Sequence, residues 1–361
     1  MTEPPRDPDR SPDDAADDPA ATEQTPDPRI GMVIDGRYRV VRRVGGGGMG
    51  EVYEASHETI QRRSAIKFLH AKYSARSSML ARFRREAKAA GRLEHENITA
   101  VIDFGVTDDV PYLVMEYLEG EDLAHLLRRQ RAPLPAPRSV SLLLQACRGI
   151  ELAHRRGTVH RDLKPQNLFV CRRADGSDLV KVLDFGVAKM SDGTQTGDGT
   201  ATQTGTAVGT PCYMSPEQAR GDKRIDERTD VYALGLILYE CLTGTRAYRG
   251  DSYNAVLYQV LHRRPEPLGE LRPELPTRLI RIVDRATAFE PADRYESADE
   301  LAAALQAALD QMLARGEQPR NAEPELEPGM QTVRQADDGE RSGEEASGSA
   351  AHATDVATPS G

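Results

Sequence analysis

The chain has 361 residues, 39% of them hydrophobic, and a formal net charge of −10. No stretch is long and apolar enough to span a bilayer and no signal peptide is visible, which argues against membrane-embedded and exported proteins. We therefore expect a cytoplasmic protein with no membrane partner. The cysteines show no paired spacing and suit reduced thiols rather than a disulfide framework; they are Cys147, Cys171, Cys212 and Cys241.

The negative charge is concentrated at the two ends of the chain. Residues 1–30 contain nine acidic residues, three arginines and seven prolines, and residues 316–361 contain ten acidic residues and three arginines. Both segments are poor in large apolar side chains, so we expect disordered acidic tails. Their net charges of −6 and −7 leave +3 for residues 31–315. A core of this charge suits a polyphosphate ligand, whereas the tails lack the basic character of nucleic-acid-binding arms.

A glycine-rich hairpin is the first element expected after the N-terminal tail. Residues 44–52 read VGGGGMGEV, in which Gly45, Gly47 and Gly50 fit the pattern GxGxxG between apolar stretches at 38–44 and 51–55. Glycines allow the backbone to close over phosphates without Cβ clashes. A dinucleotide-binding turn would need a helix at the third glycine, but residues 52–53 continue as a strand. A merely flexible hairpin is the other interpretation.

A short β-like run at residues 64–69 follows, with Lys67 in its middle. The next segment has the spacing of an amphipathic helix, and Glu86 shares the apolar stripe that should face inward. A carboxylate there needs a cation, for which Lys67 is the natural candidate. Otherwise Glu86 lies at the edge of the stripe and pairs with a helix arginine. The stripe is Phe83, Ala87 and Ala90, the cap is Ser77 or Ser78, and the alternative partners are Arg82 and Arg85.

Three further helices are predicted. One covers residues 140–156 and ends at Gly157, and another covers residues 297–313. Residues 231–242 form the most apolar stretch, which is too short for a membrane span and is typical of the buried helix of a large lobe. Asp230 precedes this stretch and could be its N-cap.

Two polar motifs carry the chemistry. Residues 160–167 read HRDLKPQN, and Asp184 begins the triplet DFG 22 residues after Asp162. The Asp162 carboxylate can accept the proton of an attacking hydroxyl, and Lys164 can meet a transferred phosphoryl group as a point charge. Asn167 and Asp184 offer the oxygen ligands that Mg²⁺ prefers. Taken singly, these residues could also be turn or cap residues.

In this ordered set the chain resembles the eukaryotic-like (Hanks-type) serine/threonine protein kinases, most closely those of bacteria, over residues 38–313. The resemblance implies an α+β bilobal protein kinase fold. Its N-lobe, residues 38–115, would contain antiparallel strands and one helix, and its C-lobe, residues 119–313, would be mainly helical. ATP would bind in the cleft between them.

The resemblance assigns roles to individual residues. Asp162 would be the catalytic base, Asn167 and Asp184 the metal ligands, and Lys67 with Glu86 the ion pair that orients the phosphates. Residues 112–120 would form the last N-lobe strand and the hinge, with Met115 as gatekeeper. The implied nucleotide-binding set is Val44, Gly45, Gly46, Gly47, Gly48, Met49, Gly50, Val52, Ala65, Lys67, Met115, Glu116, Leu118 and Phe169.

Specificity and regulation are also implied by the resemblance. Lys164 after Asp162, and the Gly-Thr-Pro at residues 209–211 before Ser-Pro-Glu at 215–217, resemble the serine/threonine branch. Arg161 would pair with a phosphate on a threonine-rich activation segment, with Thr202 and Thr204 as autophosphorylation candidates. The implied structural residues are Arg161, Thr210, Glu217 with its buried partner Arg294, and Asp230 as support for the catalytic-loop backbone.

We therefore expect an ATP-dependent, non-specific serine/threonine protein kinase that uses Mg²⁺, or Mn²⁺ in its place, and is activated by autophosphorylation. Its partners would be Ser/Thr-containing proteins and a transient kinase homodimer, with no nucleic acid. Two alternatives are a pseudokinase scaffold and a small-molecule phosphotransferase. The presence of Lys67, Asp162, Asn167 and Asp184 argues against the first. The peptide-docking segment 209–217 argues against the second.

Overall fold

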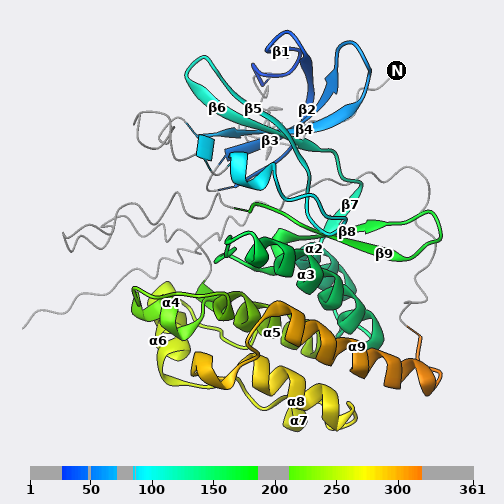
Figure 1. Ribbon diagram of the computed structural model, residues 1–361, viewed down its shortest axis with the longest axis vertical. Coiled ribbons are helices and arrows are strands. Elements are labelled where there is room, and N and C mark those ends of the chain that lie inside the picture. The colour runs from blue at the N-terminus through cyan, green and yellow to red at the C-terminus, as the bar shows by residue number, and fades with distance from the viewer. Residues whose placement is uncertain (1–26, 48–49, 71–83, 86, 186–210, 319–361) are drawn as a thin grey trace, which may run out of the picture.

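The N-terminal lobe contains a six-stranded antiparallel sheet (Figure 1). The structure is a computed structural model that describes residues 27–47, 50–70, 84–85, 87–185 and 211–318. The strand order is β1-β2-β3-β4-β6-β5. Residues 84–85 and 87–90 are helical and lie beside this sheet. The strands are β1 (Val33–Ile34), β2 (Tyr38–Gly47), β3 (Gly50–His57), β4 (Arg63–Leu69), β5 (Val101–Thr107) and β6 (Val110–Glu116).

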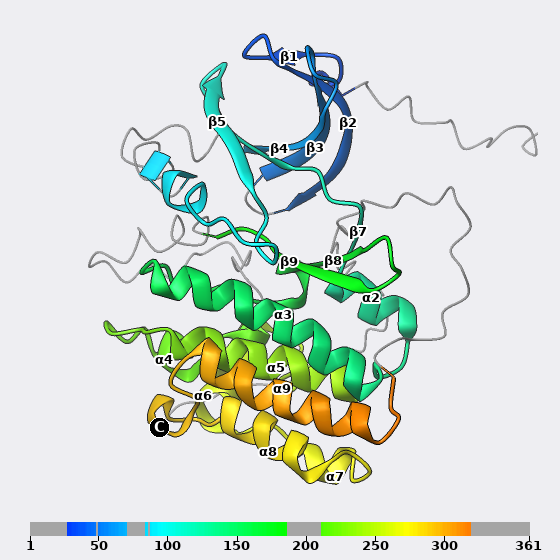
Figure 2. The same cartoon turned by 45° about the vertical axis from the view of Figure 1, so that its right-hand side comes forward.

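The two faces of this sheet have different roles because strand side chains alternate. One face gathers a small apolar core that includes Tyr53, Ile66 and Phe68. The opposite face, which carries Val52, Ala65 and Lys67, turns toward the C-terminal lobe. The sheet is strongly curved, as Figure 2 shows.

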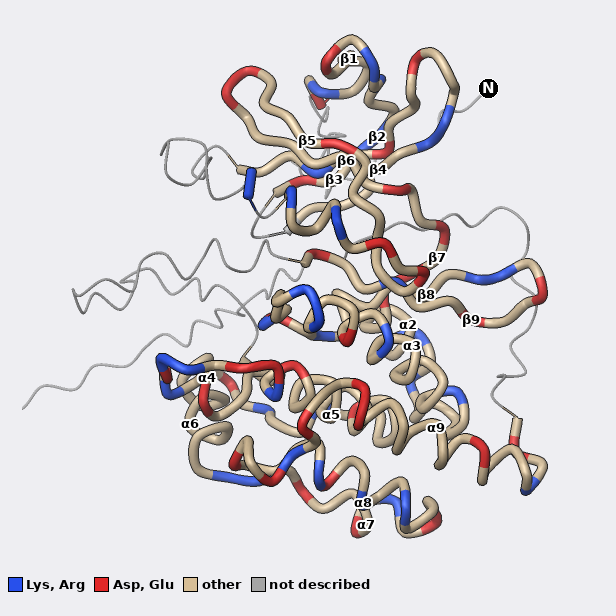
Figure 3. The backbone as a smooth tube through the Cα atoms, viewed as in Figure 1, with Lys and Arg blue, Asp and Glu red and all other residues tan. Residues whose placement is uncertain are grey.

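The C-terminal lobe is mainly helical, with a three-stranded sheet of β7 (Gly120–Asp122), β8 (Leu168–Arg172) and β9 (Asp178–Val182) at its upper edge. Residues of both charge signs are interspersed along both lobes (Figure 3). The described helices are α2 (Leu123–Gln130), α3 (Ala136–Arg155), α4 (Pro216–Arg220), α5 (Arg228–Thr243), α6 (Tyr253–His262), α7 (Leu268–Leu271), α8 (Thr277–Ala286) and α9 (Ala298–Ala314), with 3₁₀ turns η2 (Pro165–Asn167), η5 (Pro211–Tyr213) and η6 (Pro291–Asp293). None of these helices is long and apolar enough to cross a membrane.

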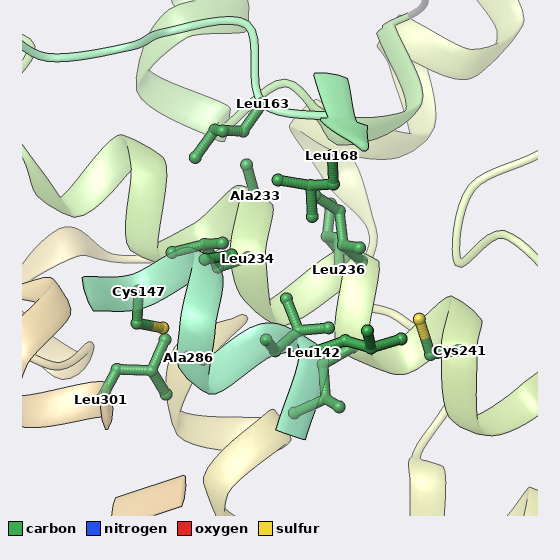
Figure 4. Close-up of a cluster of buried hydrophobic side chains, with 14 of the residues drawn as sticks. Leu142, Cys147, Leu163, Leu168, Ala233, Leu234, Leu236, Cys241, Ala286 and Leu301 are labelled. Carbon is green, nitrogen blue, oxygen red and sulfur yellow. The ribbon is translucent and has the colours of Figure 1, made fainter. Parts of the chain in front are cut away.

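Helix α5 is the centre of the lower core. Thirteen of its residues are buried, which confirms the buried helix predicted from residues 231–242. Its Leu234 and Leu236 lie among side chains of α3, such as Leu142 and Cys147, and near Ala286 of α8 (Figure 4). Because apolar residues cover nearly its whole circumference, this helix can only be stable with neighbours on every side.

The other predicted helices occur with shifted ends. Helix α9 begins after the N-cap Ser297, whose side chain accepts a hydrogen bond from the Glu300 amide. Helix α3 begins at residue 136, four residues before the predicted start. Pro137 lies in its first turn, where a missing N–H leaves no helical hydrogen bond unmade, so the proline does not delay the helix.

The N-terminal lobe begins earlier than the composition suggests. Residues 27–30 belong to the expected acidic tail, but they form a turn against the sheet, where Asp27 accepts a hydrogen bond from Tyr53 at 2.7 Å. Composition averages over thirty residues and cannot detect a few side chains that find partners in the fold.

A buried ion pair connects helix α4 to the residue that follows the turn η6. Arg294 donates to both Glu217 oxygens at 2.7 and 2.8 Å, and the two side chains are 0% and 6% exposed. Arg294 also donates to three backbone carbonyls, those of Arg228, Ala288 and Phe289. Burial alone would raise the pKa of Glu217, but the hydrogen bonds and charge of Arg294 outweigh it and hold the pKa below its usual value.

We expect Arg294→Met to lower the free energy of unfolding by about 3–5 kcal/mol, because it leaves the Glu217 carboxylate buried without a cation. Urea denaturation measures this change. Arg173→Met is the matched control, since its ion pair with Glu96 is 40% and 57% exposed and should contribute at most about 1 kcal/mol. Equal losses in the two variants would contradict the prediction.

Acid should also remove the stabilisation that the Glu217–Arg294 ion pair provides. The folded-state pKa of Glu217 is depressed, so its stabilisation is fully present above the unfolded-state pKa of about 4.3 and is lost as the pH falls through the lower folded value. Between about pH 5 and 3, the free energy of unfolding should therefore fall less steeply in Glu217→Gln than in the parent protein. Urea midpoints measured across this range test the difference, and parallel pH profiles would count against it.

Candidate active site

A cavity lies between the N-lobe sheet and the small sheet of the C-terminal lobe. Strands β2, β3, β4 and β6 form its upper wall, and β8 and the residues after β9 form its floor. Its lining consists of Val44, Gly45, Val52, Ala65, Lys67, Thr99, Met115, Glu116, Tyr117, Leu118, Glu121, Asp122, Gln166, Phe169, Leu183 and Asp184. Most of the predicted nucleotide-binding residues therefore lie around one cavity.

One glycine of the hairpin, Gly50, is required by close backbone packing. Gly46, Gly47 and Gly50 belong to the paired ends of β2 and β3, beyond the part of the hairpin that lines the cavity. A Cβ atom on Gly50 would lie 2.0 Å from the Phe68 carbonyl oxygen, so no other residue fits without moving the strand. Gly48 and Met49 lie outside the described residues.

Lys67 and Asp184 meet across the cavity. The Lys67 Nζ lies 2.7 Å from both Asp184 carboxylate oxygens, and the two side chains are 9% and 23% exposed. Burial alone would raise the pKa of Asp184, but the charge and hydrogen bonds of Lys67 hold it below its ordinary value. The partner predicted for Lys67 is Glu86, which lies outside the described residues. No local pattern in the sequence indicates the contact with Asp184.

The catalytic motif forms a tight loop before β8. Lys164 Nζ lies 3.0 Å from Asp162 Oδ2, and the Asn167 amide donates to the Asp162 carbonyl at 2.7 Å. Asn167 uses its nitrogen in this bond, which leaves its side-chain oxygen for a cation. Among the described residues, no three His, Cys, Asp or Glu side chains form a metal-binding group. Asn167 and Asp184 would therefore share a hard cation with phosphate oxygens and water.

Asp230 holds this loop from below. Its carboxylate accepts from the backbone N–H groups of His160 and Arg161, each at 2.8 Å, and lies 2.8 Å from His154 Nε2. Arg161 has a φ of 67°, a left-handed conformation that needs such outside support. The N-cap of α5 is Glu227, which makes no side-chain cap bond, so the interpretation of Asp230 as the N-cap is wrong.

Several lining residues were missed by sequence reasoning. Asp122 is the N-cap of α2 and accepts from the His125 amide at 2.8 Å, so a search for capping residues could have found it. Leu183 directly precedes the predicted metal ligand Asp184, and this position next to the motif could have indicated it. Tyr117 and Gln166 lie within the predicted hinge and the predicted catalytic motif, where neighbouring residues were assigned roles. Thr99 and Glu121 carry no local signal, because only the tertiary fold brings them to the cavity.

The threonines predicted for the activation segment, Thr202, Thr204 and Thr210, lie outside the described residues. Arg161 is described, and its Nε atom is buried with no hydrogen-bond partner in the described part of the chain.

Comparisons with known proteins agree with this geometry. The family described as protein kinase domain matches residues 38–314. The chain is 42% identical over 290 residues to the serine/threonine-protein kinase Pkn1 of Myxococcus xanthus, covering 80% of this chain and 40% of that protein. It is 37% identical over 281 residues to PrkC of Bacillus subtilis, covering 78% and 42%. The chain thus spans less than half the length of these two relatives.

Solved structures share the fold. The crystal structure of the Mycobacterium tuberculosis PknI kinase domain aligns with a TM-score of 0.61 and 29% identity, and covers 77% of this chain and 98% of that one. This confirms the predicted bilobal fold. The chain therefore belongs to the protein kinase family, among the Hanks-type serine/threonine kinases of bacteria.

Proposed function

We propose that this protein transfers the γ-phosphoryl group of ATP to serine and threonine hydroxyls of proteins, with Mg²⁺ as the divalent metal. The observation that carries the proposal is the meeting of Lys67 and Asp184 at 2.7 Å inside a cavity whose floor adjoins the Asp162 loop. The names of Pkn1 and PrkC, both serine/threonine-protein kinases, support the same activity.

The apolar end of the cavity suits a purine. Val52, Ala65 and Met115 from the N-lobe strands and Phe169 from β8 line it together. The backbone of Glu116 and Leu118 would hydrogen-bond the adenine edge. Asp122 and Gln166 add polar groups to the lining, and a ribose would lie beside them.

The charged end suits the phosphates. Lys67 would release part of its contact with Asp184 and bind phosphate oxygens as a point charge. Asp184 and Asn167 would then hold the metal, which neutralises the charge of the triphosphate when bound. Mg²⁺ fits because it takes few protein oxygens and keeps waters and phosphates as its other ligands.

Asp162 is placed to receive the proton of the attacking hydroxyl. Its carboxylate is 33% exposed, so a substrate hydroxyl can reach it, and Lys164 at 3.0 Å would remain beside the transferring group. Glu217 and Arg294 lock the segment beyond the activation loop onto the C-terminal lobe, which would present a protein substrate to Asp162.

We expect the purified protein to transfer radiolabelled phosphate from ATP to a generic basic protein in the presence of Mg²⁺. Asp162→Asn and Lys67→Met should each lower the rate by about 10²–10³-fold, because they remove the base and a phosphate-binding charge. Arg173→Met is the control, since the side chains of Arg173 and Glu96 are 40% and 57% exposed and neither residue lines the cavity.

Other outcomes of this assay favour the alternatives. ATP binding without transfer to any protein would indicate a pseudokinase scaffold. Transfer to small amines or alcohols, but not to protein, would indicate a small-molecule phosphotransferase. Full activity of Asp162→Asn would refute the proposed base.

We also propose activation by autophosphorylation at Thr202 and Thr204, with Arg161 as the phosphate partner. The unpartnered Nε of Arg161 within the described part of the chain supports this role. Replacing both threonines with alanine should lower activity toward an added substrate by at least about tenfold, since it removes charge-assisted hydrogen bonds. Phosphate mapping by mass spectrometry identifies the sites. A double variant that keeps full activity would disprove the proposal.

A further inference from the structure

The segment in front of the kinase domain is fixed to the N-lobe sheet. The family match begins at residue 38, but residues 27–34 already lie against the strands. Backbone hydrogen bonds of 2.9 Å join Gly31 N–H to the Val40 carbonyl and Val40 N–H to the Met32 carbonyl. Strand β1 then pairs with β2. Arg29 is therefore held close to the sheet by the backbone on its C-terminal side.

Arg29 contacts three positions of the sheet on the face away from the cavity. Its guanidinium forms an ion pair with Glu51, donates to the Tyr53 hydroxyl at 3.3 Å, and lies 5.0 Å from the centroid of the Phe68 ring. The Arg29 and Glu51 side chains are 31% and 25% exposed, so the pair is partly shielded from solvent.

These contacts lie directly behind two residues that line the cavity. Val52 is flanked by Glu51 and Tyr53, and Lys67 precedes Phe68. Val52 and Lys67 are direct partners in the β3–β4 ladder, as are Glu51 and Phe68. Since side chains alternate along a strand, Arg29 on one face lies behind the Val52–Lys67 pair on the other.

A second contact strengthens this attachment. The Tyr53 hydroxyl donates to Asp27 at 2.7 Å, and Tyr53 is fully buried. Burial raises the pKa of Tyr53 to about 12, so the hydroxyl remains a donor at neutral pH. Asp27 and Arg29 thus hold both neighbours of Val52 from the same segment.

In its described part, the glycine hairpin is held by backbone pairing and by charged contacts at its flank. Glu51 follows Gly50 and lies opposite Gly46 in the ladder, and its second oxygen is 3.2 Å from Arg43 of β2. Glycines have no side chains to pack and allow many backbone conformations. Charged contacts at the flank of the hairpin therefore restrain strands that the glycines cannot restrain.

We propose that Arg29 is a positioning residue for the nucleotide, acting through Glu51, Tyr53 and Phe68 on Val52 and Lys67. This inference rests on the proposed ATP-dependent function. It assigns residues 27–34, which precede the family match, to the nucleotide-binding unit. Arg29 itself does not line the cavity.

Steady-state kinetics of Arg29→Gln test this role. We expect the KM for Mg-ATP to rise about threefold to tenfold, with kcat within about twofold of the parent value, because the phosphate-binding groups are displaced and not removed. Calorimetric titration should show that the affinity for Mg-ADP falls by a similar factor. Adenosine lacks phosphates and relies on the hinge, so its affinity should change by less than about twofold.

Arg39→Gln is the matched control. Arg39 pairs with exposed Glu58 at 2.8 Å and reaches the Gly31 carbonyl at 3.2 Å, so it contacts the same segment. Its ladder partner is Ser56, away from the cavity-lining residues. The control should keep the parent KM for Mg-ATP. A general loosening of the segment would instead raise KM equally in both variants and would overturn the proposal.

The remaining outcomes are also decisive. A folded Arg29→Gln variant with the parent KM refutes the positioning role. If that variant does not fold, Glu51→Gln replaces it, and an unchanged KM there refutes the role equally. Arg29→Lys keeps the charge and should raise KM less than Arg29→Gln. If the parent protein binds no ATP, the proposed function itself is refuted. If the parent protein is active and Arg29→Gln has the parent KM for Mg-ATP, only the positioning role of Arg29 is refuted.

Discussion

The buried carboxylate of Asp230 is the interaction on which the catalytic geometry depends. It is 1% exposed and accepts hydrogen bonds from two backbone amides of the catalytic loop, those of His160 and Arg161. A buried carboxylate is costly unless its oxygens are satisfied, so α5 and the loop stabilise each other in one arrangement. Helix α5 is itself fixed on all sides by the apolar core of the C-terminal lobe. The packing of that core therefore also holds the catalytic loop in place.

Contacts of the same loop also reach the N-terminal lobe. The His160 ring nitrogen lies 2.9 Å from the Leu183 carbonyl, and Leu183 precedes Asp184. Asp184 in turn contacts Lys67 of β4 at 2.7 Å. A continuous set of polar contacts therefore runs from α5 to the N-lobe sheet. Behind Lys67, the contacts of Arg29 hold the sheet from its opposite face, so the lysine lies between two sets of restraints.

Local sequence signals predicted the helices better than they predicted which residues contact one another. The apolar stretch at 231–242 and the helical pattern at 297–313 identified α5 and α9, because these signals act within one element. The predicted start of α3 is too late because Pro137 is a first-turn residue, which the apolar spacing does not reveal. The sequence allowed Asp230 to be a cap, a support for the loop, or both, and only the structure assigned it the second role.

The sequence by itself determined the family, the order of the motifs and most of the residues around the cavity, since those depend on residue types at fixed spacings. Only the tertiary structure decided that Lys67 contacts Asp184, that Thr99 and Glu121 line the cavity, and that Arg29 belongs to the N-lobe. These contacts join residues far apart in the chain. Their partners are selected by burial and by the need to satisfy charge, which no local pattern records.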